Sequence, residues 1–325
     1  MKANVLTLPA EFTAAYTDTD RELVAEVMAW LNRDDAHTHA ELARLSRLPA
    51  STISSVLAGK YPSSPSRQLT ALAGVCRTAA ARAAVVATVP FVETSTYRLA
   101  FNACHRARLY RNFGVLPGAV GTGKTRALRE YARITPGTFL IEGVPDMTPS
   151  LLLSALMTAT GASAGSSSPG ERLFALINAL RGTDSLLILD EAEKVKPACL
   201  EHLRRLRDQA GVGVVLAGTD DLIAMLNKEA GQFGQVRSRV GFWPQTIRAI
   251  TRDDCEALVA AGFPDYAIGA DVLEACWTVC AGSVRVLVES LIPAVHDYGL
   301  AKGHELSAQL VRQVATTVLG LKVRA

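Results

Sequence analysis

One eight-residue stretch constrains this chain more than any other: Gly118-Ala119-Val120-Gly121-Thr122-Gly123-Lys124-Thr125. It fits the spacing G-x-x-x-x-G-K-[ST] of a phosphate-binding P-loop. The glycines permit a tight turn whose backbone N–H groups face phosphate oxygens, while the lysine reaches the β and γ phosphates and the final threonine offers its hydroxyl to Mg²⁺. An apolar segment precedes the stretch (113–116) and a helix-compatible run follows it (126–132). The sequence therefore predicts a strand–loop–helix unit that binds ATP with Mg²⁺ through all eight residues.

A second motif supplies carboxylates. Residues 186–189 form an apolar run that ends in Asp190 and Glu191. Buried parallel strands read as continuous apolar runs, and the acids would lie at the carboxyl edge of the sheet, where ligands bind. We expect Asp190 to hold Mg²⁺ and Glu191 to orient and polarise the attacking water.

A third apolar strand, over residues 214–218, ends in Thr219. Its hydroxyl would lie beside the γ phosphate and help to place the water; an ordinary strand-capping threonine is the alternative. Further on, Gly282-Ser283 precedes Arg285 at the start of a helix. We expect Arg285 to reach the nucleotide from a helical lid.

Arg237 and Arg239 flank Ser238 in an expected loop before Val240. An arginine from a neighbouring subunit can neutralise the charge that develops in phosphoryl transfer. We favour Arg239 for this role and keep Arg237 as the alternative. An exposed arginine pair can also be no more than a solvated loop.

The N-terminal segment predicts short helices. One covers about His39–Ser46, residues 47–49 break it, and another runs through Ile53 and Leu57 to Gly59. Two helices joined by a tight turn form a helix-turn-helix pattern. The outward positions of the second helix carry no Arg, Asn or Gln for bidentate base reading; they are Ser51, Thr52, Ser54 and Ser55, with Lys60 just after. We expect sequence-tolerant DNA contact there, with a protein-interaction or packing domain as the alternative.

The composition bounds the rest. The chain has 325 residues, 49% hydrophobic and a net charge of +3, which permits two or three domains and neither demands nor excludes nucleic acid. No apolar run approaches the roughly 20 residues of a membrane span, and no secretory signal is apparent at the N-terminus. We therefore expect a cytoplasmic protein with no membrane partner. Cys276 and Cys280, one helical turn apart among apolar neighbours, predict buried thiols.

Four segments follow from these patterns. We place a helix-turn-helix domain at 1–65, a helical linker at 66–95, a nucleotide-binding domain at 96–248 and a helical lid at 249–325. The Gly/Ser-rich tract 161–170 is expected to be a loop inside the nucleotide-binding domain.

The ordered set of P-loop, acidic pair, polar-tipped strand, Ser-Arg and Gly-x-x-Arg resembles the AAA+ ATPases. That resemblance implies an α/β fold, with a parallel five-stranded sheet, helices on both of its faces and a helical lid.

A closer resemblance adds the N-terminal domain order and four further stretches: Phe91-Val92-Glu93-Thr94, Arg129-Glu130-Tyr131, Leu189-Asp190-Glu191-Ala192 and Gly213–Gly218. Together these features, over roughly residues 21–319, resemble the phage Mu B-type transposition proteins, the AAA+ target-selection ATPases of Mu-like transposons. The interior Ala119-Val120 of the P-loop lacks the proline often found in that family. The tract 161–169 is also less basic than a DNA-facing loop should be.

The resemblance implies a protein that binds duplex DNA without strong sequence preference when loaded with ATP and assembles as helical filaments. It implies recruitment and stimulation of a DDE transposase, delivery of target DNA, and release after hydrolysis, near the nucleoid of a bacterial host. The ATPase residues would be Lys124, Thr125, Asp190, Glu191, Thr219 and Arg239. Candidate DNA contacts of the nucleotide-binding domain are Lys194, Lys196, Arg204 and Arg205, with a solvated helix face as the alternative.

Two other functions compete with this interpretation. A helicase loader would need a helicase-binding element at the N-terminus, where this chain offers a helix-turn-helix. An ATP-responsive transcription regulator would bind one operator, which the lack of base-reading side chains over 51–57 opposes.

Overall fold

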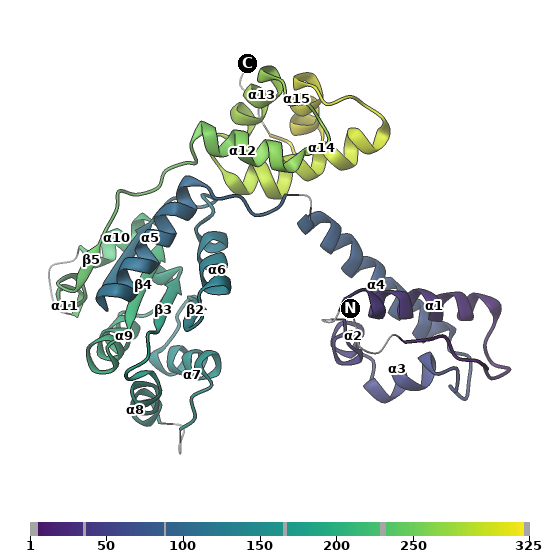
Figure 1. Ribbon diagram of the computed structural model, residues 1–325, viewed down its shortest axis with the longest axis horizontal. Helices are drawn as coiled ribbons and strands as arrows, with labels where there is room; N and C mark the ends of the chain where they lie inside the picture. Colours follow the sequence, from purple (N-terminus) through teal and green to yellow (C-terminus); the bar gives the residue numbers. More distant parts are fainter. Residues whose placement is uncertain (1–5, 35–36, 88, 165–167, 228–231, 322–325) are drawn as a thin grey trace. The chain divides into compact units, whose positions relative to one another are not determined.

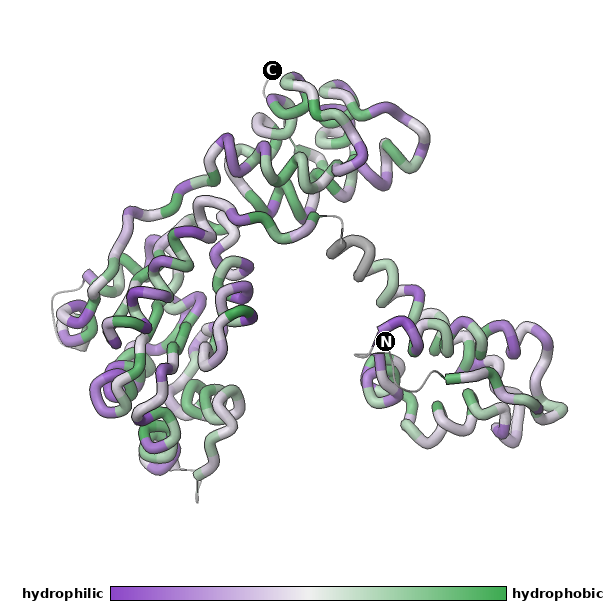
Figure 2. The backbone as a smooth tube through the Cα atoms, in the orientation of Figure 1, coloured by the Kyte–Doolittle hydropathy of each residue, from purple (hydrophilic) through white to green (hydrophobic). Residues whose placement is uncertain are grey.

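The computed structural model describes residues 6–34, 37–87, 89–164, 168–227 and 232–321. The chain divides into two compact units, Met1–Thr88 and Val89–Ala325. Figure 1 shows the helices and strands of both units. In both, helices alternate between hydrophobic and hydrophilic residues along their turns, the pattern of elements with one buried face (Figure 2).

The N-terminal unit contains four described helices: α1 (Asp18–Arg33), α2 (His39–Ser46), α3 (Ala50–Leu57) and α4 (Ser66–Ala87). Thr17 caps α1 in a capping box with Asp20. Arg47, in the left-handed conformation at φ 59°, ends α2 and begins the tight turn into α3. The two expected short helices are therefore present, and whether they contact DNA stays a prediction.

The helix α4 packs into this unit, although the sequence analysis treats residues 66–95 as a linker. Leu69, Leu72, Ala73 and Cys76 are buried with Leu42 in one hydrophobic core. Their spacing of three and four residues places them on one helical face, which gives α4 a packing role. The structure separates its units after Thr88, so the interior of the expected linker belongs to the N-terminal helices. The other domain boundaries stay predictions.

The second unit is built on a parallel sheet. Its strands are β1 (Phe113–Pro117), β2 (Thr138–Glu142), β3 (Leu186–Asp190), β4 (Gly213–Gly218) and β5 (Val240–Phe242). All pairings are parallel, and the strand order is β2-β3-β4-β1-β5. The three central strands β3, β4 and β1 are buried throughout. The expected five-stranded parallel sheet is confirmed.

Alternate residues of these strands face opposite helical layers (Figure 1). Leu187 and Leu189 pack in the core that contains α7 (Pro149–Thr160), α8 (Pro169–Leu180) and α9 (Pro197–Ala210). Leu186 and Ile188 pack in the core of α5 (Ser95–Tyr110) and α6 (Lys124–Ile134). Two shorter helices, α10 (Asp220–Leu226) and α11 (Gln232–Arg237), lie between β4 and β5. Helices therefore cover both faces, as expected.

A helical region follows the sheet. Its elements are α12 (Arg252–Gly262), α13 (Ala270–Cys280), the π-helical segment η2 (Arg285–Leu291), α14 (Ile292–Tyr298), the short turn η3 (Leu300–Lys302) and α15 (Ala308–Thr317). They share one core, in which Cys255, Cys276 and Cys280 are buried as free thiols, as the sequence predicts for the last two. The buried Asp254 accepts hydrogen bonds from the backbone and hydroxyl of Ser95, which joins this region to the start of α5.

Among the described residues, no single helix has the length and apolar character of a membrane span. Two segments, Ala270–Cys280 and Arg285–Lys302, meet those criteria only when taken together, and they are bent by 107° to each other.

Candidate nucleotide site

The P-loop joins β1 to α6. Gly121 and Gly123 have φ angles of +81° and +90°, a conformation that strains residues with a Cβ. A Cβ at Gly121 would also lie 2.7 Å from the Ser283 hydroxyl oxygen. The hydroxyl of Thr122 donates to the carbonyl of Ala119 at 2.9 Å and braces the loop from inside. Glycine therefore fits these two positions, where the loop turns with positive φ angles.

Lys124 is buried at the first position of α6. Its Nζ donates to the carbonyl oxygens of Gly118 at 2.7 Å and of Ala119 at 3.0 Å. Burial lowers the pKa of Lys124, while the carboxylates of Asp190 and Glu193 act in the opposite direction. The ammonium group is thus held inside the loop by backbone carbonyls, which a phosphate can replace as partners.

Thr125 and Asp190 meet at the floor of the site. The Thr125 hydroxyl donates to Asp190 Oδ2 at 2.6 Å, and the Glu191 amide donates to Asp190 Oδ1 at 2.9 Å. The Asp190 carboxylate is buried at the carboxyl end of β3. Hydroxyl and carboxylate oxygens are ligands that Mg²⁺ accepts, so this pair fits the expected ion.

Glu191 adopts an unusual conformation for a residue with a side chain, with φ at 53°. Its carboxylate forms an ion pair with Lys194 at 2.5 Å, and its side chain is 37% exposed. The expected water-orienting carboxylate therefore lies at the site with a cation already bound to it.

These groups surround a cavity of about 360 Å³. The predicted residues that line it are Val120, Gly121, Gly123, Lys124, Thr125, Asp190, Glu191, Thr219 and Arg285. Gly118, Ala119 and Thr122 shape the loop behind it. The Thr219 hydroxyl caps α10 by accepting from the Asp221 amide at 3.3 Å, and the Arg285 amide donates to the Gly121 carbonyl at 3.2 Å. The structure thus brings the start of η2 onto the P-loop, and whether the Arg285 side chain reaches the nucleotide stays a prediction.

The charged residues of this cavity that were not predicted are Arg126, Arg129, Glu142, Glu193 and Glu289. Glu193 follows the acidic pair after one alanine, and Arg126 and Arg129 follow Lys124 on the same helix, so their places in the sequence were usable signals. Glu142 and Glu289 come from distant elements, and their spacing gives no such signal.

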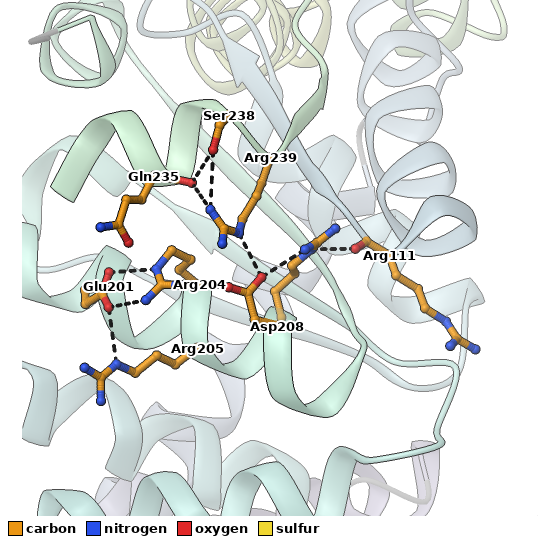
Figure 3. A network of polar contacts seen from close by, with 9 residues as sticks. Arg111, Glu201, Arg204, Arg205, Asp208, Gln235, Ser238 and Arg239 are labelled. Carbon is orange, nitrogen blue, oxygen red and sulfur yellow. Dashed lines mark hydrogen bonds and ion pairs between the residues drawn. The ribbon is translucent and has the colours of Figure 1, made fainter.

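Arg239 does not line the cavity of its own chain. Its Nε donates to Asp208 Oδ1 at 2.9 Å, and a terminal nitrogen donates to the carbonyl of Gln235 at 2.6 Å (Figure 3). Asp208 also accepts from Arg204 at 2.6 Å and from Arg207 at 2.9 Å. By contrast Arg237 is exposed, with no ion pair or hydrogen bond of its guanidinium to any described residue.

The expected DNA-contacting residues differ in availability. Arg204 is held between Glu201 and Asp208 with its side chain only 16% exposed, and Glu201 also pairs with Arg205 (Figure 3). Lys194 pairs with Glu191, whereas Lys196 is exposed at the start of α9. In the N-terminal unit, Ser51, Ser54 and Lys60 are exposed while Thr52 and Ser55 are half-buried. Arg204 is therefore less accessible than Arg205 or Lys194.

Comparison with known families explains this arrangement. Residues 107–226, which contain the P-loop, the acidic pair and Thr219, match the AAA domain family. The chain carries an AAA domain. Its P-loop and acidic strand are the parts expected of that fold.

Curated relatives cover most of the chain. The Mu-like prophage FluMu DNA transposition protein B of Haemophilus influenzae is 26% identical over 263 residues, which is 79% of this chain and 91% of the relative. The ATP-dependent target DNA activators B of Escherichia phages Mu and D108 are each 28% identical over 289 residues, 87% of this chain and 91% of theirs. The resemblance to Mu B-type transposition proteins is confirmed.

Solved structures support the fold alone. Cdc6p from Pyrobaculum aerophilum superposes with a TM-score of 0.54 at 20% identity, over 70% of this chain and 68% of its own. A Walker-type ATPase of Pyrococcus abyssi gives 0.50 at 14% identity, over 71% and 74%. Both likenesses are consistent with the parallel sheet and its helices described above.

Proposed function

We propose that this chain is an ATP-dependent, largely sequence-tolerant duplex-DNA-binding ATPase that delivers target DNA to a DDE transposase. The observation that carries the proposal is the convergence of Lys124, Thr125 and Asp190 on one cavity in a chain similar to the target DNA activators B. Its place of action is the cytoplasm of a bacterial host, on the nucleoid.

In this proposal the P-loop amides and Lys124 bind the phosphates. Thr125 and Asp190 hold Mg²⁺, which would screen the phosphate charge when bound. Glu191 must exchange Lys194 for the attacking water before it can polarise that water. Thr219, at the tip of the next strand, steadies the water from the other side.

The arginine from the neighbouring subunit must come from the segment 237–239. If Arg239 performs this role, assembly must first release it from Asp208 and the Gln235 carbonyl. If Arg237 performs it, no bond to a described residue has to break. The two candidates therefore differ in the contacts that must break before they can reach a neighbouring nucleotide. Alanine variants of each arginine test which one is required for turnover.

DNA binding is proposed to use the more exposed cations, one of which, Arg205, also pairs with Glu201. Lys196 and Arg205 present their charges at α9, and Lys60 does so in the N-terminal unit. Contacts from lysine and arginine to phosphates carry little sequence information, which suits a protein that accepts many targets. Stimulation of hydrolysis by DNA, and coupling of hydrolysis to DNA release, belong to the same proposal.

Negative-stain electron microscopy with random-sequence duplex DNA tests this function. We expect helical filaments with ATP and none with ADP, and the ATP-dependent filaments should be absent for Lys124→Ala. The matched control is Lys124→Ala with no DNA, which should show the same folded particles as the wild type. Closed rings or monomers in both nucleotide states would favour a helicase loader or an ATP-responsive regulator instead.

A further inference from the structure

A third carboxylate lies in the nucleotide cavity beside the acidic pair. The short turn η1 (Ala192–Lys194) directs the chain from the tip of β3 toward the tip of β4, and Glu193 on this turn lines the cavity. A Cβ at Gly218 would lie only 2.2 Å from Glu193 Oε2. The carboxylate is therefore packed against the end of β4, next to Thr219.

Glu193 Oε2 has no hydrogen-bond donor. The oxygen is shielded from solvent, and no described protein group lies within hydrogen-bonding reach of it. An unsatisfied buried acceptor costs about 1–3 kcal/mol, and more if it is charged. Such an atom in a cavity indicates that its donor arrives with the ligand.

Glu193 and Glu191 differ in their bonding partners. Glu191 is paired with Lys194, and its side chain is partly exposed. Glu193 has no such bond, and its charge acts on Lys124 more strongly than that of Glu191 does. Since Lys124 marks the phosphate end of the site, the charge of Glu193 acts at that end.

A triphosphate repels a carboxylate, so the donor to Glu193 must stand between them. The groups available at the tip of β4 are the Thr219 hydroxyl and water. Thr219 Oγ1 already accepts from the Asp221 amide and retains one proton to donate. Once the Glu193 carboxylate turns out of its shielded position, a water held between Thr219 and Glu193 would satisfy this oxygen at the γ-phosphate end of the cavity.

We infer that Glu193 is a further catalytic residue, which accepts a hydrogen bond from the attacking water at the tip of β4. The inference rests on the proposed ATPase function. The water oxygen forms a bond to the γ phosphorus as the bond to the bridging oxygen breaks, and that electron pair stays on ADP. The water proton passes to a carboxylate and then to the released phosphate. Gly218 is required because any side chain there would displace Glu193.

The test compares Glu193→Gln with the wild type in three measurements: ATP turnover with Mg²⁺ and DNA, affinity for a fluorescent ATP analogue, and melting temperature without nucleotide. We expect turnover to fall about a hundredfold, in the range for loss of a general base. Affinity should be unchanged, and the melting temperature should not fall, because Glu193 makes no bond in the nucleotide-free protein. Glu256→Gln, an exposed glutamate of the lid, is the matched control and should change none of the three.

Gly218→Ala is the independent second variant. Its Cβ displaces the Glu193 carboxylate, so turnover should fall as in Glu193→Gln while the nucleotide still binds. The same Cβ lies 3.0 Å from the buried Leu222 side chain, so the melting temperature of this variant is not part of the test. Normal turnover in Glu193→Gln overturns the inference. So does a parallel loss of affinity or a lower melting temperature, since either would assign Glu193 a binding or structural role. Absence of turnover in the wild type would instead remove the proposed function itself.

Discussion

Charged groups are bonded differently in the nucleotide cavity and in the arginine network, which is formed by Asp208 of α9 with Arg204, Arg207 and Arg239. In the cavity, Lys124 bonds only to backbone carbonyls and Glu193 carries an orphaned oxygen. In the network, Asp208 accepts from three arginines (Figure 3). Buried polar groups are normally satisfied, and exceptions gather where a ligand completes them. The contrast indicates that the cavity is arranged for an absent partner, whereas the network is complete in the single chain.

The largest expected effect concerns the cavity. Lys124→Ala should weaken ATP binding at least a hundredfold, which corresponds to about 2.7 kcal/mol. It should leave the unfolding free energy nearly unchanged because water can replace the ammonium at the two carbonyls. Fluorescent-nucleotide titration and urea denaturation measure the two quantities. Lys196→Ala, an exposed lysine, is the control. If Lys124→Ala strongly lowered the unfolding free energy but left ATP affinity normal, Lys124 would have a structural role like that of the arginine network.

The network should show the opposite response. Asp208→Ala leaves three arginines without their carboxylate, so we expect a loss of about 2–3 kcal/mol in unfolding free energy with unchanged affinity for ATP. Asp265→Ala, an exposed aspartate in the loop after α12, controls for the loss of one negative charge. Equal stability of the two variants would show that the network is only a surface arrangement.

Acid should weaken the same network. Hydrogen bonds from Arg204, assisted by Arg205, lower the pKa of Glu201 to about 2. Because this folded-state pKa lies below the unfolded value of about 4.3, the stabilisation is complete above pH 4.3 and is lost as the pH falls toward 2. Glu201→Gln should therefore be less stable than the wild type by roughly 1–2 kcal/mol at pH 7, after allowance for solvent screening. Urea denaturation from pH 7 to pH 3 should show the two curves converging below pH 4.3, and a constant difference would contradict the assignment.

The smallest effect separates the two candidate trans arginines. Arg239→Ala should cost about 1 kcal/mol of stability through loss of Asp208, whereas Arg237→Ala should lie within about 0.5 kcal/mol of the wild type. DNA-stimulated turnover of the two variants then assigns the catalytic role. A loss of turnover in Arg239→Ala alone supports our preference for Arg239. A loss of turnover in Arg237→Ala alone assigns the catalytic role to Arg237.

Much of the fold followed from local patterns. The continuous apolar runs before Gly118, Asp190 and Thr219 marked the three strands β1, β3 and β4, and the helical spacing around residues 39–57 marked α2 and α3. The residues themselves marked neither β2 nor β5: Thr138–Glu142 is short with no flanking motif, and Val240–Phe242 has only three residues. The spacing of Leu69, Leu72, Ala73 and Cys76 by three and four residues was a usable signal for a packed face of α4, which the prediction of a helical linker over 66–95 did not use.

The sequence by itself determined the phosphate-binding loop, the acidic pair and their order along the chain. These features depend on backbone conformations and spacings within a few residues, which glycine, lysine and carboxylate side chains specify directly. Only the tertiary structure decided that Glu193 packs against Gly218 and that Arg239 bonds to Asp208 on α9. Those contacts join residues on separate elements, and the packing of strands and helices against the sheet sets which of them meet.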